Sequence, residues 1–402
     1  MIFVLGGGVV DGTGTGLRRG EGVLIRAGRV VDVGTAANIE PADAVRVDAG
    51  GAVIVPGFVD SHTHVTIRPG EGNQHGQVLQ PPVWQAIRGV ENLRRMLASG
   101  VTTARIMTEQ AGIDLEYRAA IDRGEVIGPR LRVSGPGLSP PGGHGSSAGG
   151  VAGVRDLRDA VRERAAAGVD HIKIFATGGV SSEDSSLADA LYSAEEITAI
   201  VEEAASAGLR VSAHAIAGPG VDLSVANGVY SVEHGSVLSA ETAAEMASRG
   251  VWLVLTSTIA YHPAGIEQGD ARSDAIMAKL REDRVNGRES ARIAREVGVR
   301  IAVGTDSMHG LFGYELEWLV EQGWTAGEAL TAATRSGAEV AGVDDAGTLA
   351  PGKRADLVLL RSDPLADIKA VYDVAGVYRD GVELVNAAGF ARPQAAALAV
   401  TG

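Results

Sequence analysis

The sequence has 402 residues and contains no cysteine. Disulfide bonds, thiolate metal sites and thiol nucleophiles are therefore excluded, so any metal ion must be held by histidine, carboxylate or a modified side chain. Chains without disulfides are typical of reducing compartments, and we expect a cytoplasmic location.

Positive charge and long apolar runs are also scarce. Lysine and arginine together number 36 against 50 aspartates and glutamates, which gives a formal net charge of −14. This charge opposes binding to a phosphate backbone or to an anionic membrane surface. The chain has no apolar run of the ~18 residues that a spanning helix needs, and its first residues, MIFVLGGGVVDGTG, lack the basic segment of a leader peptide. We expect no nucleic-acid or membrane partner, and a small-molecule substrate.

Glycine, in contrast, is abundant, and the segments between glycine turns at both ends of the chain are typical of short strands. In residues 1–57 these are Ile2–Leu5, Gly22–Arg26, Arg29–Val33, Val45–Asp48 and Ala52–Val55, and after residue 345 they are Leu357–Leu360, Val371–Val377 and Val382–Val385. We predict that residues 1–57 and 345–402 form one small β-sandwich domain. The Ala-rich tail Pro393–Gly402 is expected to be weakly anchored.

Residues 58–344 alternate between short apolar runs and longer stretches of helical period, which indicates strand–helix units around a parallel sheet. The candidate strands are Gly57–His64, Val101–Met107, Arg130–Gly135, His171–Ala176, Arg210–Ala215, Tyr230–Gly235, Trp252–Thr258 and Arg300–Asp306. The clearest helices are Trp84–Ala98, Val154–Ala167, Ala194–Ala207, Ala240–Arg249, Ala271–Val297 and Thr325–Ala341. The pattern predicts an α/β fold, a (β/α)8 TIM barrel, whose active site lies at the carboxyl ends of its strands.

Several candidate metal ligands fall at the ends of these predicted strands. His62 and His64 are two residues apart, so on a strand they point to the same side and can reach one ion. His214 and His234 follow apolar strands and could supply a second pair of nitrogen atoms, while Asp306 supplies an oxygen ligand. Each residue alone is more often a buried group satisfied by its neighbours, so the prediction depends on their combination.

Lys173, in HIKIF, places an amine among apolar neighbours. Desolvation lowers the pKa of a buried lysine and makes its neutral form accessible. A neutral amine can add carbon dioxide, and the resulting carbamate is a carboxylate that can bridge two metal ions. The alternative is a salt-bridged lysine inside the barrel.

These motifs resemble the metal-dependent amidohydrolase superfamily, in particular its imidazolonepropionase-like and prolidase-like members. The motifs are VDSHTHV (59–65), HIKIFATGG (171–179), SAHA (212–215), VEHGS (232–236) and GTDS (304–307). The resemblance implies a binuclear centre in which His62, His64 and Asp306 bind one divalent metal and His214 and His234 bind the other. It also implies that N6-carboxylated Lys173 bridges both ions. Zinc is expected, although nitrogen and oxygen ligands also accept manganese, iron or cobalt.

Four further residues follow predicted strands and could line the pocket. His144, in PGGHG, could hydrogen-bond a substrate carbonyl or carboxylate, and Tyr192, Tyr261 and His309 could contact the substrate. Each could equally be a loop residue without such a role. Residues 67–83 form a plausible loop over the barrel mouth, where loops often set specificity.

We therefore expect a hydrolase that cleaves the C–N bond of a linear or cyclic amide, such as an N-acyl amino acid or a peptide-like compound. Two metals would acidify a bridging water and polarise the carbonyl, and Asp306 would carry a proton to the leaving nitrogen. The alternatives are a lactonase, esterase or phosphotriesterase on the same centre, a mononuclear ring-opening hydrolase or deaminase, and a non-catalytic scaffold. The resemblance also implies a homo-oligomer.

Three positions depart from the prolidase-like pattern. Ala215-Ile216 stand where relatives carry a tyrosine or a second histidine, Arg105 is followed by Ile106 rather than by an acid, and Ser146-Ser147 follow GGHG in place of an acid. These changes remove polar groups from the expected pocket. We expect less polar N-acyl or cyclic amides to be better substrates than Xaa-Pro dipeptides.

Overall fold

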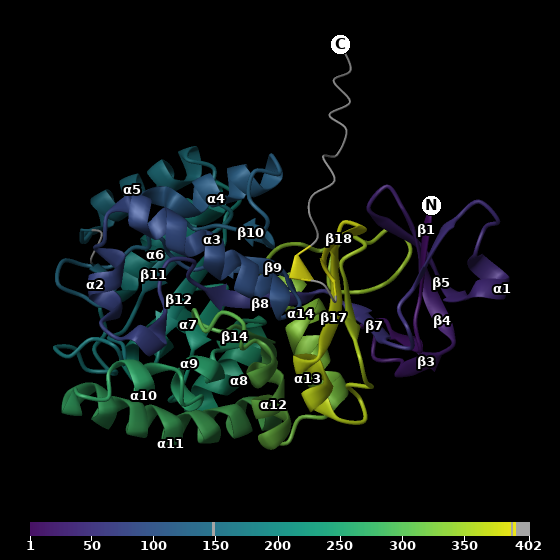
Figure 1. Cartoon of the computed structure of the whole chain (residues 1–402). Helices are drawn as coiled ribbons and strands as arrows, with labels where there is room; N and C mark the ends of the chain where they lie inside the picture. Colours follow the sequence, from purple (N-terminus) through teal and green to yellow (C-terminus); the bar gives the residue numbers. More distant parts are fainter. Residues whose placement is uncertain (147–148, 387–388, 391–402) are drawn as a thin grey trace, which may run out of the picture.

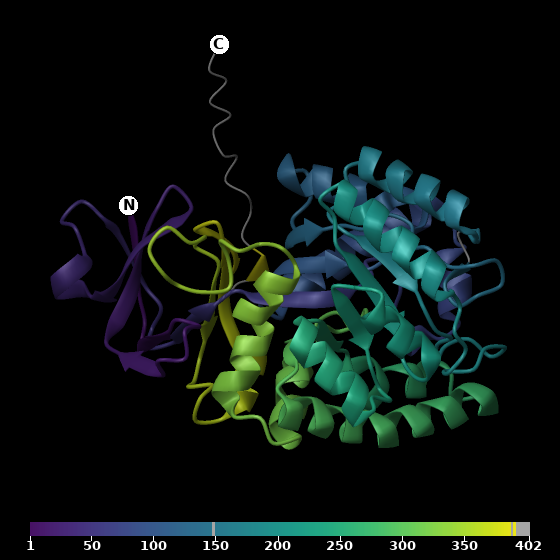
Figure 2. The same cartoon turned by 180° about the vertical axis from the view of Figure 1, so that it is seen from behind.

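The computed structural model describes residues 1–146, 149–386 and 389–390. A larger body of strands and helices lies beside a smaller β region that holds the N-terminus (Figure 1). Figure 2 shows the same two parts from behind. The tail Pro393–Gly402, for which the sequence predicts weak anchoring, and Ser147 of the loop motif lie outside the described residues.

Parallel strands form the centre of the larger body, in a three-stranded sheet of order β10-β9-β8 and a five-stranded sheet of order β11-β12-β13-β14-β15. Their bounds are β8 Phe58–Thr63, β9 Val101–Ile106, β10 Arg130–Arg132, β11 Ile172–Phe175, β12 Val211–Ala215, β13 Ser231–His234, β14 Trp252–Leu255 and β15 Arg300–Val303. Most of their residues are buried, as expected of parallel strands that are covered on both faces. The predicted α/β fold class is confirmed.

Backbone hydrogen bonds join the two parallel sheets on both sides. The N–H of Leu138, in the chain after β10, donates to the carbonyl of Lys173 at 2.8 Å, and the N–H of Phe175 donates to the carbonyl of Leu138 at 2.9 Å. On the other side, the N–H of Asp306, just beyond β15, donates to the carbonyl of His62 in β8 at 2.8 Å. Strand ends that are far apart in the sequence are thereby brought together.

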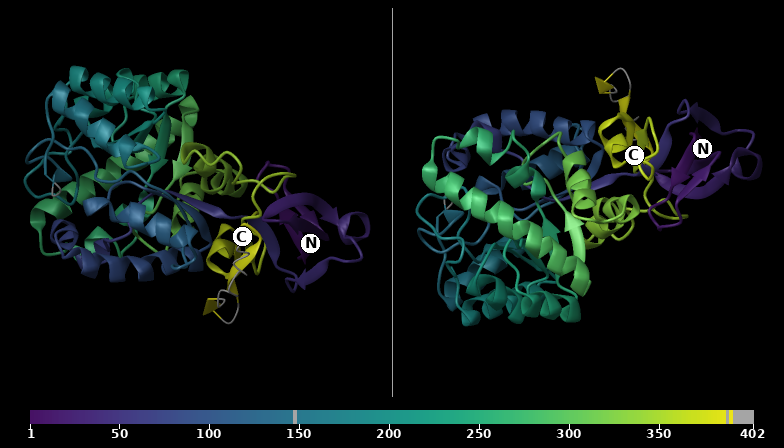
Figure 3. Two further views of the ribbon diagram at one scale, coloured as in Figure 1. Left: turned by 90° about the horizontal axis from the view of Figure 1, so that it is seen from above. Right: turned by 90° about the horizontal axis from the view of Figure 1, so that it is seen from below.

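Helices follow most of these strands and cover their outer side (Figure 3). The longer ones are α3 Pro82–Ala98, α4 Ile113–Asp122, α5 Val154–Ala166, α6 Ala194–Ser206, α7 Pro219–Ala226, α8 Ala240–Arg249, α11 Asp274–Val297, α12 Gly313–Glu321, α13 Ala326–Ala333 and α14 Arg335–Val340. Short helices are α1 Ala36–Ile39, α2 Gln74–Val78, α9 Ser257–Tyr261 and α10 Ile266–Gly269, with 3₁₀ turns at Pro69–Glu71, Gln110–Gly112 and Ile368–Tyr372. Within the described ranges, no helix is both long and apolar enough to cross a membrane.

Side-chain caps fix where several helices begin. The hydroxyl of Ser193 accepts from the N–H of Glu196 at the start of α6, and the glutamate side chain accepts in return from the N–H of Ser193. Thr325 and Glu328 make the same reciprocal pair at the start of α13. Each pair satisfies donors that a helix end leaves free.

Several elements end differently from their prediction. β10 stops at Arg132 and β15 at Val303, each three residues before the predicted end, and the predicted strand Val371–Val377 begins only at Val374, after the 3₁₀ turn Ile368–Tyr372. The predicted strand Trp252–Thr258 stops at Leu255, because the N–H groups of Ser257 and Thr258 donate to the carboxylate of Glu315, at 2.9 and 2.6 Å, and begin α9. The helix predicted over residues 325–341 is broken at Thr334, whose φ of −128° and ψ of −89° lie outside the helical region. The chain resumes as α14 after this residue.

The two ends of the chain form two further sheets. One has four strands in the order β5-β4-β1-β6, and the other has seven in the order β19-β18-β17-β16-β7-β2-β3 and combines both chain ends. The strands are β1 Ile2–Leu5, β2 Gly8–Val10, β3 Leu17–Arg19, β4 Glu21–Arg26, β5 Arg29–Thr35, β6 Val45–Asp48, β7 Val53–Pro56, β16 Leu357–Leu360, β17 Val374–Arg379, β18 Val382–Asn386 and β19 Gly389–Phe390. Val4 and Val23 from the first sheet share one buried hydrophobic cluster with Ile54 and Leu357 from the second.

Strand β7 of the seven-stranded sheet runs almost directly into β8. Gly57 alone separates them, and a Cβ atom at this position would lie 2.1 Å from Oγ1 of Thr102. Glycine is therefore needed at this close approach to the neighbouring chain. The same run of chain carries His62 near its end.

Candidate metal centre

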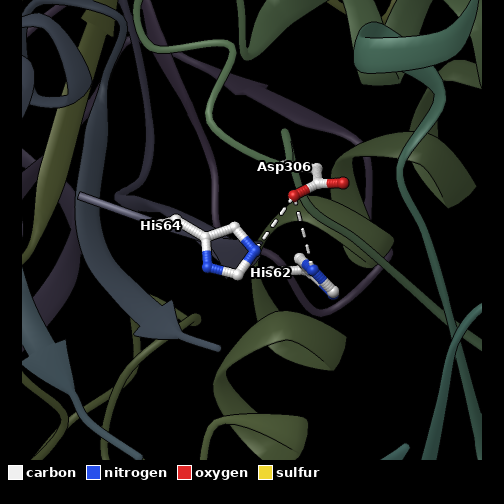
Figure 4. A group of neighbouring side chains, drawn as sticks. All are labelled: His62, His64 and Asp306. Atoms are coloured by element: carbon white, nitrogen blue, oxygen red, sulfur yellow. Dashed lines mark ion pairs between the residues drawn. The ribbon is translucent and has the colours of Figure 1, made fainter. Parts of the chain in front are cut away.

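His62, His64 and Asp306 lie together just at or beyond the ends of β8 and β15 (Figure 4). Nε2 of His62 lies 3.6 Å from Oδ1 of Asp306, and Nε2 of His64 lies 3.2 Å from the same oxygen. One ligand atom from each residue falls within 4.8 Å of the others, a spacing that can hold a metal ion. The structure thus brings these three predicted ligands together.

The second ring nitrogen of each of these two histidines faces a hydrogen-bond acceptor. Nδ1 of His62 donates to Oε2 of Glu233 at 2.8 Å, and Nδ1 of His64 donates to the carbonyl of Thr108 at 3.0 Å. Because a carboxylate and a carbonyl only accept, each Nδ1 carries a proton, and in the neutral ring the lone pair is on Nε2. This is the tautomer in which a histidine can bind a metal through Nε2. Burial lowers the pKa of His62 well below its ordinary value, so this ring is neutral. Burial acts in the same direction on His64, but the hydrogen bond and charge of Asp306 outweigh it and raise the pKa of His64.

Glu233 is itself fixed by a buried polar network. Arg105 donates to both carboxylate oxygens of Glu233, at 2.8 and 2.9 Å, and also to the hydroxyls of Ser212 and Ser231. Arg105 is 1% exposed and Glu233 is fully buried. Neither residue is among the predicted site residues, although Glu233 stands next to a predicted ligand in VEHGS. A charged residue beside His234 in a strand was the signal that could have indicated it.

Asp306 combines an unusual backbone conformation with a strongly acidic side chain. Its φ is +46° and that of Ser307 is +74°, a left-handed region that non-glycine residues adopt only where the surroundings enforce it. Burial acts to raise the pKa of Asp306, but His62, His64 and Lys173 outweigh it and lower the pKa to about 2. Asp306 is therefore ionised at neutral pH, as an oxygen ligand must be.

His214 and His234 form a second group of nitrogen donors. Their rings lie 4.6 Å apart, and the ring of His234 lies 4.7 Å from that of His62. Nε2 of His214 donates to the carbonyl of Gly178 at 3.1 Å, which leaves the lone pair on Nδ1, and Nδ1 of His234 lies 2.7 Å from the hydroxyl of Thr256. Burial lowers the pKa of both histidines well below its ordinary value, so both rings are neutral, the form that binds metals.

Lys173 lies in β11 and is 1% exposed. Its Nζ makes no hydrogen bond to any described residue and lies 5.2 Å from the ring of Phe175. Burial lowers the pKa of Lys173 to about 8, although Glu233 and Asp306 oppose the shift. Within the described ranges it also has no ion-pair partner, so the salt-bridged alternative is not observed. A buried amine without a partner requires an explanation.

His144 and Tyr261, two of the predicted substrate contacts, line the cavity that contains these groups. The ring of His144 lies 4.6 Å from that of His214, and its Nδ1 lies 2.6 Å from Oγ of Ser182. Burial and the charge of Lys173 lower the pKa of His144 to about 4. His144 is therefore neutral at pH 7.

Tyr192 and His309 lie elsewhere. Tyr192 is part of the hydrophobic core and donates its hydroxyl to the carbonyl of Val151 at 2.8 Å. His309 lines a separate cavity together with Arg68 and Arg95. Contact of either residue with a substrate stays a prediction.

The cavity has a volume of about 1290 Å³, its opening to solvent included. Much of its wall is apolar, from residues that include Val180, Ile216, Leu255, Ile259 and Ala260, and part of the predicted loop 67–83 contributes through α2. In the described part of the chain, Lys173 is the only lysine or arginine in this lining, and two further carboxylates, Glu109 and Asp283, belong to it. Ile216, one of the departures from the prolidase-like pattern, makes the wall more apolar.

Comparison with known proteins gives the family. Residues 53–384 match the model of the amidohydrolase family, and the chain belongs to this family. Ochratoxinase from Aspergillus niger is 31% identical over 357 residues, which cover 81% of this chain and 73% of that protein. Imidazolonepropionase from Salinispora arenicola is 28% identical, over 96% of this chain and 94% of that protein. The resemblance inferred from the motifs is thereby confirmed.

Solved structures support the same family assignment. A prolidase crystallised with N-methylphosphonate-L-proline has a TM-score of 0.87 to this chain at 33% identity, and the match covers 95% of this chain and 98% of that one. The crystal structure of A. niger ochratoxinase has a TM-score of 0.85 at 28% identity, with 96% and 95% covered. The protein is an enzyme, a hydrolase of the amidohydrolase family.

Proposed function

We propose that the protein is a binuclear metal-dependent hydrolase that cleaves the C–N bond of an amide by attack of an activated water. The buried amine of Lys173 carries the proposal. It has no hydrogen-bond partner in the described part of the chain, yet its charge acts on His62, His234 and Asp306 alike. An amine in this position is suited to become a carbamate shared by two groups of ligands.

The donor set fits two divalent ions. His62, His64 and Asp306 would hold one, and His214 and His234 would hold the other, with N6-carboxylated Lys173 as the bridge. Neutral imidazole nitrogens and ionised oxygens are ligands that zinc accepts, and the fixed tautomers of His62 and His64 support the assignment. When bound, the ions would acidify a water between them and polarise the substrate carbonyl.

The residues of the chain would perform the remaining steps. Asp306, ionised and beside both histidines, would take a proton at Oδ2 and return it to the leaving nitrogen. Neutral His144, held by Ser182, would donate a hydrogen bond to the substrate carbonyl oxygen and so stabilise its developing negative charge. The apolar cavity wall would exclude water from the reacting bond.

The substrate would be an N-acyl amino acid, a peptide-like compound or a cyclic amide. Relatives named ochratoxinase, imidazolonepropionase and prolidase support this class. The apolar wall, including Ile216, supports the expectation that less polar amides are better substrates than Xaa-Pro dipeptides.

We further infer that the parallel strands form one closed (β/α)8 barrel over residues 58–344. The backbone hydrogen bonds that join the two parallel sheets on both sides support it. The hydrophobic cluster shared by the terminal sheets supports a β-sandwich domain of residues 1–57 and 345–402. A cytoplasmic homo-oligomer is the expected form in the cell.

The test is a substrate screen on metal-loaded protein, with N-acyl amino acids, dipeptides, lactams, lactones and phosphotriesters in one panel. Amide or lactam turnover that is lost with chelator and restored with divalent metal is the expected result. Faster turnover of lactones or phosphotriesters would replace the proposal by the esterase-type alternative. If dipeptides were hydrolysed faster than all other amides, the expected substrate preference would be wrong, but amide hydrolysis would still hold.

A further inference from the structure

Asp283 brings a buried carboxylate into the wall of the cavity. It lies in α11, is 6% exposed, and its carboxylate is hydrogen-bonded by the side chain of Ser236. The charge of the neighbouring Arg284 acts on Asp283 from a distance, but the two form no ion pair, because the guanidinium of Arg284 donates to the carbonyl of Ala260 and pairs with Glu267 at 2.7 Å. Burial of a carboxylate without a cationic partner is costly, so its retention in a cavity wall requires a reason.

Trp318 lines the same part of the cavity and is 2% exposed. Its indole Nε1 makes no hydrogen bond to any described residue. The ring lies 5.1 Å from that of Tyr261, which also lines the cavity. A Cβ atom at Gly287 of α11 would lie 2.7 Å from Oη of Tyr261, so glycine at this position leaves room for the aromatic pair. The two rings and Asp283 together make a subsite with aromatic walls and one acidic group.

The charges around the cavity disfavour a negatively charged group of the substrate in this subsite. Arg284 and Arg288 follow Asp283 on α11, and the guanidinium of Arg288 lies 5.3 Å from the ring centre of Tyr261, but neither arginine lines the cavity, which leaves Trp318 as the aromatic wall without a cation beside it. The lining residues of the described chain therefore offer a carboxylate here and no arginine or lysine. A substrate carboxylate at Asp283 would bring two like charges together in a partly dry site, which is strongly unfavourable.

We propose that Asp283, with Trp318 and Tyr261, binds a protonated amine or guanidine at the end of an otherwise apolar amide substrate. A buried carboxylate accepts charge-assisted hydrogen bonds from such a group, and aromatic faces attract the same cation. This inference rests on the proposed amide hydrolysis and adds the chemical class of the distal end of the substrate. Asp283 is thereby a specificity-determining residue outside the predicted metal ligands.

A matched substrate series tests the inference. Phenylacetyl amides of butylamine, aminobutanol, diaminobutane and aminobutanoic acid share one scissile bond and end in methyl, hydroxyl, ammonium and carboxylate. With metal-loaded wild type we expect the ammonium compound to have the highest kcat/KM and the carboxylate compound the lowest, with about tenfold or more between them, mainly in KM. Asp283→Asn should remove this advantage, and exposed Glu282→Gln on the same helix is the matched control.

Direct binding separates this inference from the proposed function. Calorimetric titration of metal-loaded protein with the ammonium and carboxylate compounds reports affinity whether or not the amide is cleaved. Tighter binding of the ammonium compound without turnover would support the subsite and contradict amide hydrolysis. Equal binding, or tighter binding of the carboxylate compound, would overturn the subsite. The relative affinities of the two compounds for wild-type protein test the subsite even if Asp283→Asn fails to fold. Thermal melting would show whether that variant is folded.

Discussion

Nδ1 of His62 donates a hydrogen bond to Oε2 of Glu233 at 2.8 Å, and this contact determines which nitrogen of His62 faces Asp306. Arg105 holds Glu233 in turn, so a predicted metal ligand, a carboxylate and a guanidinium from β8, β13 and β9 form one buried chain of contacts. Groups that orient a metal ligand typically change metal affinity when they are altered.

Glu233→Gln should lower metal affinity and activity by roughly 10- to 100-fold, because the amide can turn its N–H₂ toward Nδ1 of His62 and no longer fixes the tautomer. Metal affinity is measured by competition with a coloured chelator. Glu241→Gln, on the exposed start of α8, is the control. An unchanged affinity would show that His62 is oriented by other contacts.

Arg105→Met should destabilise the fold, because it leaves the carboxylate of Glu233 buried without its cationic partner. Loss of one member of a buried pair typically costs about 3–5 kcal/mol. Urea unfolding measures the free energy of unfolding, and the double variant Arg105→Met, Glu233→Gln should recover part of the loss. A double variant no more stable than Arg105→Met would contradict this account.

Metal content tests the binuclear proposal directly. We expect about two divalent ions per chain in replete protein, since the donors fall into a His62, His64, Asp306 group and a His214, His234 group. Elemental analysis gives the number. A single ion per chain that supports full activity would favour the mononuclear alternative.

Lys173→Ala should lose most activity and at least one metal ion, because it removes the amine that would become the bridging carbamate. Short carboxylic acids such as acetate or propionate should restore part of both, since they can occupy the space of the missing carbamate. Lys369→Ala, an exposed lysine in the 3₁₀ turn Ile368–Tyr372, is the control. Full activity of Lys173→Ala would show that the amine is structural.

Asp306→Asn keeps the size of the side chain and one ligand oxygen but removes the base. We expect kcat to fall by at least ~10² with little change in thermal melting. Exposed Asp373→Asn is the matched control. Near-normal turnover would assign the proton transfer to another residue, with His144 the next to test.

The fold should lose stability as pH rises, partly through Glu315. Burial raises the pKa of Glu315 to about 8 from its ordinary 4.5, although hydrogen bonds from Thr258 and Ser257 oppose the shift. An acid with a raised pKa in the folded state stabilises the fold fully below its ordinary pKa, and this contribution is lost as pH rises through the folded value. Between pH ~5 and pH ~9, the melting temperature of wild type should therefore fall relative to that of Glu315→Gln. Parallel profiles for the two proteins would disprove the contribution of Glu315.

The strands of the larger body could be predicted from the sequence because buried parallel strands are continuous apolar runs. β12, for example, begins at Val211 where the prediction begins at Arg210, and both end at Ala215. The sequence did not predict the helices α4, α7 and α12, because they are short and lie among turn residues. The break at Thr334, whose hydroxyl donates to the carbonyl of Leu330 at 2.6 Å, does not interrupt the helical period of the sequence and so could not be predicted from it.

The candidate ligands could be predicted because their residue types at strand ends are unusual in combination. Asp283 could not, since it lies in REDRVNGRES, where a charged residue is typical of an exposed helix face. Its burial arises only when α11 packs against Ser236 and Tyr261. Arg105 has no acid after it in the sequence, and in the structure it pairs with an acid from another strand, Glu233.

Gly57 links a strand of the terminal sheet to the strand that carries His62, with no loop between them. A continuous extended chain transmits displacement along its length far better than a flexible connection does. The terminal sheet should therefore anchor the predicted metal ligand His62, and a mutation that loosens this sheet should change the position of His62. For the same reason the two parts should melt in one cooperative transition rather than as independent units.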